Sequence, residues 1–274
     1  MINYIKKMDK RKLMLSYVLN LIMIILFIGS IIVEVVNIHN NPKSLYKNVW
    51  GLFRYFTIDG NLMSFIFTTI ILVKQYQAIK KKDYESQAPS NKSQFLYTIS
   101  LMSACTDFVI FVVVVFIFIP MSFNSVEWII NLVGTFNSSS LHVTIPILLN
   151  IRFVFFDERE RDFNLYEKFI GGMPMLLYGV TMFILCGAKV FLSFGDNGND
   201  ENGDKDGKIP YPFFDIYHES WAFCLFVSIF IFAFGFGIGF LLDFLNKKFE
   251  NKFFTTNQNG ESETQKDDSL LNEA

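Results

Sequence analysis

The chain has 274 residues and a net charge of −2, and it is strongly apolar, with 51% hydrophobic residues, 33 Phe and only 18% charged residues. A soluble domain of this size could not keep so much apolar surface away from water. Nucleic-acid binding is not expected, because the basic residues are spread along the chain and form no single patch. The three cysteines lie in apolar stretches without metal-ligand spacing, so they predict no metal site.

The apolar residues gather into stretches of about 18 to 25, the length that a helix needs to cross the hydrocarbon core of a bilayer. Each stretch should be helical, since an open strand would leave backbone groups unsatisfied in lipid. The sequence therefore predicts an all-α membrane protein built as a bundle of six transmembrane helices. In chain order, the predicted spans are residues 13–36, 52–73, 95–118, 138–156, 173–192 and 222–245.

The Lys and Arg residues between the predicted spans indicate the orientation of the chain. The N-terminal segment 1–12, the second and fourth connections and the C-terminal tail hold 17 of them, whereas the other three connections hold four. Cytoplasmic connections of membrane proteins carry such an excess of basic residues. We therefore expect both termini in the cytoplasm and a multi-pass protein of the cell membrane.

Two polar segments lie outside the predicted spans. Residues 195–208 are acidic and rich in Gly and Asn, which is typical of a flexible external loop, and they lack the ligand order of an EF-hand. Residues 246–274 are polar and low in aromatic residues, so we expect a disordered cytoplasmic tail. No internal repeat is visible, which argues against an inverted-repeat transporter.

Several ionisable side chains fall inside the predicted spans, where each must face the bundle interior, find a partner or reach an interface. Three of them lie close enough to a span end to reach the polar interface, namely Glu34, Arg152 and Lys189. Asp107 is different because it lies near the bilayer centre. It could orient His142, pair with Arg54, or stay protonated and hydrogen-bond between helices.

Thr57 and His142 lie at a similar depth. Counted from the cytoplasmic ends of their spans, they lie roughly 25 Å and 22 Å above that face. A Thr hydroxyl becomes a nucleophile when a positioned base takes its proton, and neutral imidazole is the usual base near pH 7. Asn61, one turn after Thr57, could orient the hydroxyl or donate to an oxyanion. The structural alternative is that Thr57 bonds to its own helix and His142 ties two helices together.

Three short segments carry a family resemblance: FRYFTIDGNL at 53–62, LHVTIPILLNIRFVFF at 141–156 and PYPFFD at 210–215. In this order they resemble the signatures of a bacterial family of six-helix membrane proteins. That family is distantly similar to the androgen-induced protein and the androgen-dependent TFPI-regulating protein of animals, which are membrane-embedded threonine hydrolases of fatty acid esters of hydroxy fatty acids. The resemblance implies that Thr57 is the nucleophile and His142 its base.

The third segment belongs to the bacterial pattern, and its Pro and aromatic residues suggest a rigid external cap with Tyr211 and Phe213 near the lipid headgroups. A plain turn at the entry of a helix would also explain these residues. With the resemblance included, we expect a hydrolase of lipid or fatty acid esters, with Asn61 and Asp107 in supporting roles and no metal or organic cofactor. Substrate would enter sideways from membrane lipid. The alternative is a non-enzymatic membrane protein, either a small transporter in which Asp107 and His142 relay protons or a scaffold.

Overall fold

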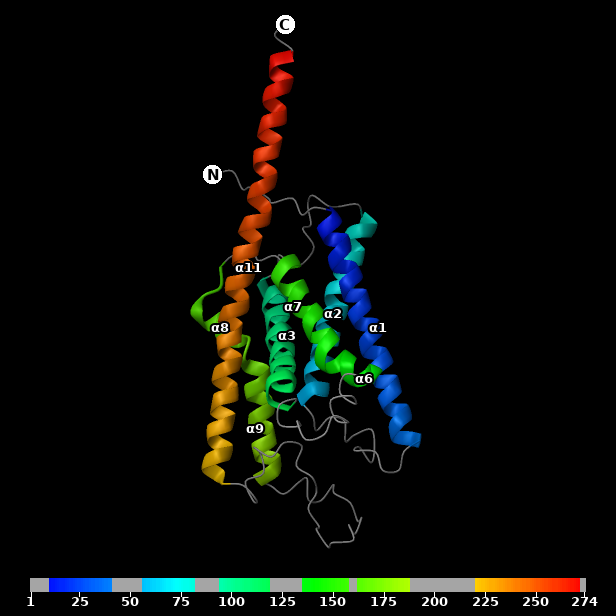
Figure 1. Ribbon diagram of the computed structural model, residues 1–274, viewed down its shortest axis with the longest axis vertical. Coiled ribbons are helices and arrows are strands. Elements are labelled where there is room, and N and C mark those ends of the chain that lie inside the picture. The colour runs from blue at the N-terminus through cyan, green and yellow to red at the C-terminus, as the bar shows by residue number, and fades with distance from the viewer. Residues whose placement is uncertain are drawn as a thin grey trace.

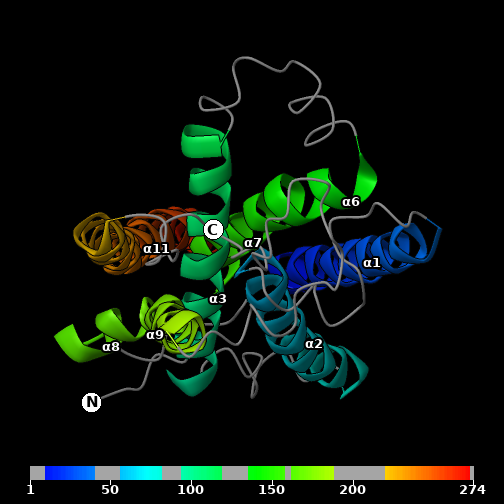
Figure 2. The ribbon, with the colours of Figure 1, turned by 90° about the horizontal axis from the view of Figure 1, so that it is seen from below.

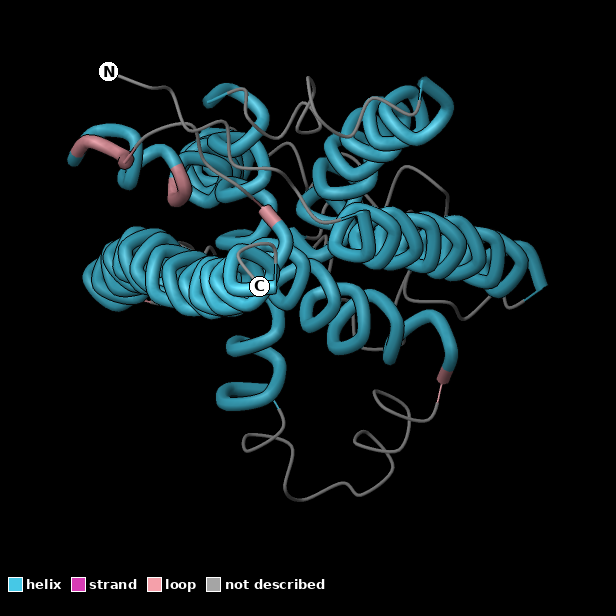
Figure 3. The backbone as a smooth tube through the Cα atoms, turned by 90° about the horizontal axis from the view of Figure 1, so that it is seen from above, coloured by secondary structure: helices cyan, strands magenta, loops and turns pink. Residues whose placement is uncertain are grey.

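The computed structural model describes residues 10–40, 56–81, 94–118, 135–157, 162–187 and 220–271. All secondary structure within these ranges is helical, as Figures 1 and 3 show, so the predicted all-helical fold is confirmed for the described part of the chain. In chain order, the helices are α1 (Lys10–Asn40), α2 (Phe56–Lys81), α3 (Gln94–Val112), the π-helical η3 (Val113–Phe118), α6 (Phe136–Ser139), the π-helical η4 (Ser140–Thr144), α7 (Ile145–Phe156), α8 (Leu165–Ile170), α9 (Met173–Gly187) and α11 (Trp221–Leu271).

The described residues include five helical stretches that are long and apolar enough to cross a membrane. These stretches are Lys12–Asn37, Phe56–Lys80, Gln94–Val115, Phe136–Phe156 and Trp221–Phe249. Each of them overlaps one of the predicted spans. The remaining predicted span, 173–192, corresponds to the shorter apolar helix α9, and its last residues lie outside the described part.

Helix α3 forms the centre of the bundle and packs against α2, α7 and α11 (Figures 1 and 2). Small side chains on α3, such as Ala104 and Thr106, let the neighbouring helices approach closely. Gly60 on α2 marks a close approach to α3, because a Cβ atom there would lie 2.7 Å from Cγ2 of Thr106. This contact presses the first turns of α2 against the middle of α3.

Phe side chains fill the space between the later helices. A Cβ atom on Gly179 of α9 would lie 2.2 Å from the ring of Phe232 on α11, so the ring packs directly on the glycine backbone. Phe169 of α8 makes edge contacts with the rings of Phe236 and Phe240, both on α11. Part of the large Phe content therefore forms the packing of α8, α9 and α11.

The C-terminal part of the chain continues α11. The helix continues to Leu271 and extends beyond the other helices (Figure 1). Residues 246–271 contain no proline, so no residue in this segment is incompatible with a helix.

Candidate functional site

Asn61 joins the two segments that carry the predicted catalytic residues. Its side chain is 1% exposed. Its Nδ2 donates to the carbonyl oxygen of Thr57, one turn earlier on α2, at 2.7 Å, and to the carbonyl oxygen of Leu141 at 3.1 Å. One amide group therefore holds the backbone of Thr57 next to the residue that precedes His142.

His142 lies in the π-helical segment η4, directly before α7. Pro146 explains the irregular helix, because it has no N–H to donate to the carbonyl of His142 four residues earlier. His142 Nδ1 lies 2.9 Å from the carbonyl oxygen of Ser138 and 3.3 Å from its hydroxyl. Since a carbonyl only accepts, the neutral imidazole carries its proton on Nδ1, and Nε2 is left with a free lone pair.

The predicted catalytic pair is brought to neighbouring turns but is not hydrogen-bonded. Helix α2 contacts η4, and Thr57 and His142 are both partly exposed. Within the described residues, no hydrogen bond joins the Thr57 side chain to His142. The structure thus places the His142 segment beside the first turns of α2, without a hydrogen bond between the two side chains.

Asp107 lies on α3 and is completely buried. Neither of its carboxylate oxygens has a hydrogen-bond partner among the described residues, so it does not orient His142 in this structure. It lies against α2, because a Cβ atom on Gly60 would be 4.0 Å from its Oδ1. Arg54, the other partner considered from the sequence, lies outside the described residues.

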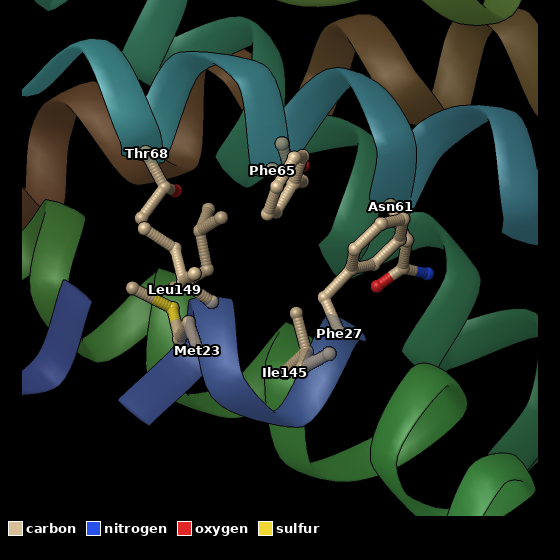
Figure 4. Close-up of a pocket in the computed structure, with 9 residues that line it drawn as sticks. Met23, Phe27, Asn61, Phe65, Thr68, Ile145 and Leu149 are labelled. Atoms are coloured by element: carbon tan, nitrogen blue, oxygen red, sulfur yellow. The ribbon is translucent and has the colours of Figure 1, made fainter. Parts of the chain in front are cut away.

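A small cavity lies beside Asn61 where α1, α2 and α7 meet (Figure 4). The volume of this cavity is about 10 Å³. This is about the space that one water needs, so an acyl chain cannot enter. The lining side chains are Met23, Ile24, Phe27, Asn61, Ser64, Phe65, Thr68, Ile145 and Leu149.

Arg152 is buried in the bundle, so the prediction that it reaches the interface is wrong. Its side chain is 1% exposed and donates to Asp157 Oδ2 at 3.2 Å, to Asn20 Oδ1 at 3.2 Å and to the hydroxyl of Ser100. Asp157 caps the end of α7, whereas Asn20 belongs to α1 and Ser100 to α3. These partners stabilise the guanidinium inside the protein, which removes the need to reach water.

The hydrogen bonds around Arg152 continue into α2 and α11. Gln75 of α2 accepts from Asn20 and donates to the Ser16 hydroxyl, both at 2.8 Å. Asn246 of α11 donates to the carbonyl of Asp157 at 2.9 Å and accepts from the Tyr97 hydroxyl at 2.9 Å. We call these residues the Arg152 network. Sequence reasoning missed it, although Asn20, Gln75 and Asn246 are polar residues within or beside apolar stretches.

The remaining site predictions lie outside the described residues, namely the external cap at Tyr211 and Phe213 and the external loop 195–208. Glu34 is half-buried and accepts a hydrogen bond from Asn137. Lys189 is also outside the described part. Within that part, no group of three or more His, Cys, Asp or Glu residues could hold a metal ion.

No protein-family model matches the chain, and neither a curated protein nor a solved structure shows significant similarity to it. The described residues define the class on their own. They form a bundle of helices, five of which have the length and apolar character of membrane spans. Its interior carries hydrogen-bonded polar groups.

Proposed function

We propose that the protein is a membrane-embedded hydrolase of lipid or fatty acid esters, with Thr57 as nucleophile and His142 as general base. The observation that carries the proposal is the double hydrogen bond of the Asn61 amide to the carbonyls of Thr57 and Leu141. It fixes the Thr57 turn against the segment that bears His142. That segment is π-helical, and such segments are frequent at functional sites.

In the proposed reaction, Thr57 Oγ1 attacks the ester carbonyl carbon while Nε2 of His142 takes the hydroxyl proton. The tetrahedral intermediate collapses, the alcohol leaves with that proton, and an acyl group remains on Thr57. Water then attacks the acyl carbonyl while His142 takes one of its protons. The ester bond to Thr57 breaks, His142 returns the proton to Thr57 Oγ1, and the fatty acid is released. Asn61 acts as a positioning residue, because both hydrogen bonds of its amide group go to backbone carbonyls.

Substrate binding must align the Thr57 hydroxyl with Nε2 of His142. Catalytic hydrogen bonds are often loose in free enzymes and tighten in the substrate complex. Thr57 is the second residue of α2, where a helix end adjusts more easily than its interior. The neighbouring cavity is too small for an acyl chain, which is consistent with a substrate whose chains stay in the surrounding lipid.

The proposal includes six transmembrane helices in the cell membrane, with both termini in the cytoplasm. Its support comes from the five long apolar helices, from α9 and from the 17 to four distribution of Lys and Arg between alternate connections. In this orientation the first turn of α2 faces the outer leaflet. Thr57 would therefore meet lipids of that leaflet.

The test uses purified protein in lipid nanodiscs, an activated fluorophosphonate probe and a branched fatty acid ester. We expect the probe to label Thr57, and we expect Thr57→Ala and His142→Ala each to lower ester cleavage by about 10³-fold or more. Thr69→Ala is the matched control, because Thr69 lies on the same helix and donates to its own backbone at 2.7 Å. Parent-like labelling and turnover in both site variants would show that the hydrolase proposal is wrong.

A second candidate function is transport, with Asp107 and His142 as a proton relay. The burial of Asp107 without a hydrogen-bond partner favours it, since membrane carboxyl groups of this kind often serve proton or ion pathways. Asp107→Asn would then abolish proton-coupled flux into proteoliposomes. The parent protein would not react with the fluorophosphonate probe.

A further inference from the structure

The main chain of Ser138 holds the proton of the neutral His142 imidazole on Nδ1. This nitrogen donates to the Ser138 carbonyl oxygen, which lies 2.9 Å away. The hydrogen bond of one ring nitrogen decides which of the two carries the proton. The position of the Ser138 carbonyl therefore determines whether Nε2 is free to act as a base.

Ser138 belongs to a helical segment that cannot hold its own position. This segment, α6, has four residues, which is about one helical turn, and Thr135 at its N-terminus provides no side-chain cap. A single turn is not stable by itself, because the nucleation of a helix costs more than one hydrogen bond returns. The irregular η4 follows directly. The place of α6 must therefore come from contacts with other helices.

Helix α1 makes such contacts with the residues directly before Ser138. The two segments lie side by side (Figures 1 and 2). A Cβ atom on Gly29 would lie 3.1 Å from Cε1 of Phe136, so this ring packs on the α1 backbone. One and a half turns further along α1, the half-buried carboxyl of Glu34 accepts a hydrogen bond from Nδ2 of Asn137. Hydrogen bonds to a carboxylate are stronger than those between neutral groups.

The hydrogen bond of Asn61 fixes the other side of His142 and does not reach Ser138. Leu141, directly before His142, is 3% exposed and packs in an apolar cluster with residues of α1 and α2. Its carbonyl accepts from Asn61. The π-helical segment begins at Ser140, between this anchor and Ser138. The Ser138 carbonyl therefore needs an anchor of its own, and α1 supplies it.

We propose that Glu34 is a positioning residue for His142. It acts through Asn137, which holds the Ser138 turn in place, and the Ser138 carbonyl then keeps the imidazole proton on Nδ1 and leaves Nε2 able to take a proton. Glu34 touches neither the ester nor the imidazole and transfers no proton. The consequence for catalysis rests on the proposed hydrolase, whereas the control of the His142 tautomer does not.

The experiment combines nitrogen-15 NMR of histidine-labelled protein in nanodiscs with kinetics on the branched ester. The His142 signals are identified by their loss in His142→Gln. We expect the parent to carry its imidazole proton on Nδ1, and Glu34→Ala to show a mixture of both tautomers. The same variant should lower kcat by about 10-fold or more and leave KM within about twofold, because the misplaced base acts only in the chemical step.

Two further variants of α1 separate the hydrogen bond from a general effect on the fold. Glu34→Gln keeps an oxygen that can accept from Asn137, so it should rescue both the single tautomer and most of kcat. Asn37→Ala is the matched control, because Asn37 is exposed on the same helix and should leave both readouts unchanged. A mixture of tautomers in the Asn37→Ala protein would show a general disturbance of α1 and would contradict the assignment.

A double-mutant cycle tests the route through Asn137. Asn137→Ala alone and the pair Glu34→Ala with Asn137→Ala should show the same tautomer mixture as Glu34→Ala, because all three lack one hydrogen bond. Additive effects would overturn the proposal, as would a single parent-like tautomer in Glu34→Ala. Asn137→Ala decides the question if Glu34→Ala does not fold. The NMR measurement uses no ester, so the expected tautomers in a parent without ester cleavage would leave the positioning role intact and refute only the hydrolase.

Discussion

Replacement of Arg152 by Leu tests whether the Arg152 network holds the helices together. The guanidinium is buried and bonds to Asp157, Asn20 and Ser100. Without it, the Asp157 carboxylate stays buried and loses the guanidinium that is hydrogen-bonded to it, so that Lys12 is left to balance its charge, and Asn20 Oδ1 loses a donor. Loss of one member of a buried ion pair typically lowers the free energy of unfolding by about 3–5 kcal/mol, which corresponds to roughly 10 °C in the midpoint of a chain of this size.

The assay follows unfolding with a dye that becomes fluorescent when it reacts with thiols. The thiols of Cys105 and Cys224 are buried and outside any disulfide, so they react only when the bundle opens. Cys186 is replaced by Ser in all variants to restrict the signal to these two thiols. The control is Lys247→Gln, which removes the partner of Asp162 in a pair whose side chains are 48% and 63% exposed. Such pairs contribute less than about 1 kcal/mol, so the midpoint should hardly change.

A midpoint of Arg152→Leu that matches the Lys247→Gln control would refute the reasoning. The double variant Arg152→Met with Asp157→Leu provides a second test. It removes both charges, and apolar replacements of a buried pair are often neutral or stabilising. We therefore expect the double variant to melt above Arg152→Leu, because the buried carboxylate is removed together with the guanidinium that balanced it.

Two further substitutions test the packing and the hydrogen bonds of α11. Gly179→Val should lower the free energy of unfolding by about 1–3 kcal/mol, because its Cβ would collide with Phe232. The control Gly237→Ala should be nearly neutral, because no neighbouring atom lies within 4 Å of a Cβ there. Equal unfolding midpoints of the two variants would contradict the close packing of α9 on α11. Asn246→Leu removes the acceptor of the Tyr97 hydroxyl and the donor to the Asp157 carbonyl, with a loss of about 1–3 kcal/mol. The same thiol assay measures both, and a parent-like Asn246→Leu would argue against the hydrogen bonds.

Much of the helical architecture could be predicted from the sequence, because span length is set by the thickness of a bilayer. The segment predicted at 95–118 is helical from Gln94 to Phe118, with a π-helical end. The segment predicted at 138–156 begins two residues earlier, at Phe136. For residues 246–271, which continue α11, a polar composition is typical of disorder but does not forbid a helix.

The partners of the buried polar groups could not be predicted in the same way. Arg152 lies near a span end, and its position alone suggests a side chain that reaches water. Arg152 can be buried because it has hydrogen-bond partners on α1, α3 and the end of α7. These partners come together only when the helices have packed. Helix lengths do not determine which helices are neighbours, so contacts of this kind require the three-dimensional structure.

The candidate site was predicted in part. The sequence predicted a similar depth for Thr57 and His142, since a position along a helix depends only on the rise per residue. The contact of Asn61 with the Leu141 carbonyl could not be derived, because it requires α2 to lie beside η4. Pro146 predicts an irregular helix upstream of it, because the proline has no N–H to donate. The same feature is also found at a simple helix kink, so it does not predict a π-helical segment in particular.

The orientation of α2 links the site to the rest of the bundle. Its buried face carries four polar residues at helical spacing, namely Asn61, Ser64, Thr68 and Gln75, and its exposed face carries Ile66, Ile70 and Val73. A soluble helix has the opposite arrangement. Burial of apolar side chains cannot orient a helix in lipid, because lipid is equally apolar, so hydrogen bonds to the polar face must do so. The bonds of Gln75 at one end and of Asn61 at the other therefore fix the rotation of α2, and with it the direction in which Ser64 faces Asp107.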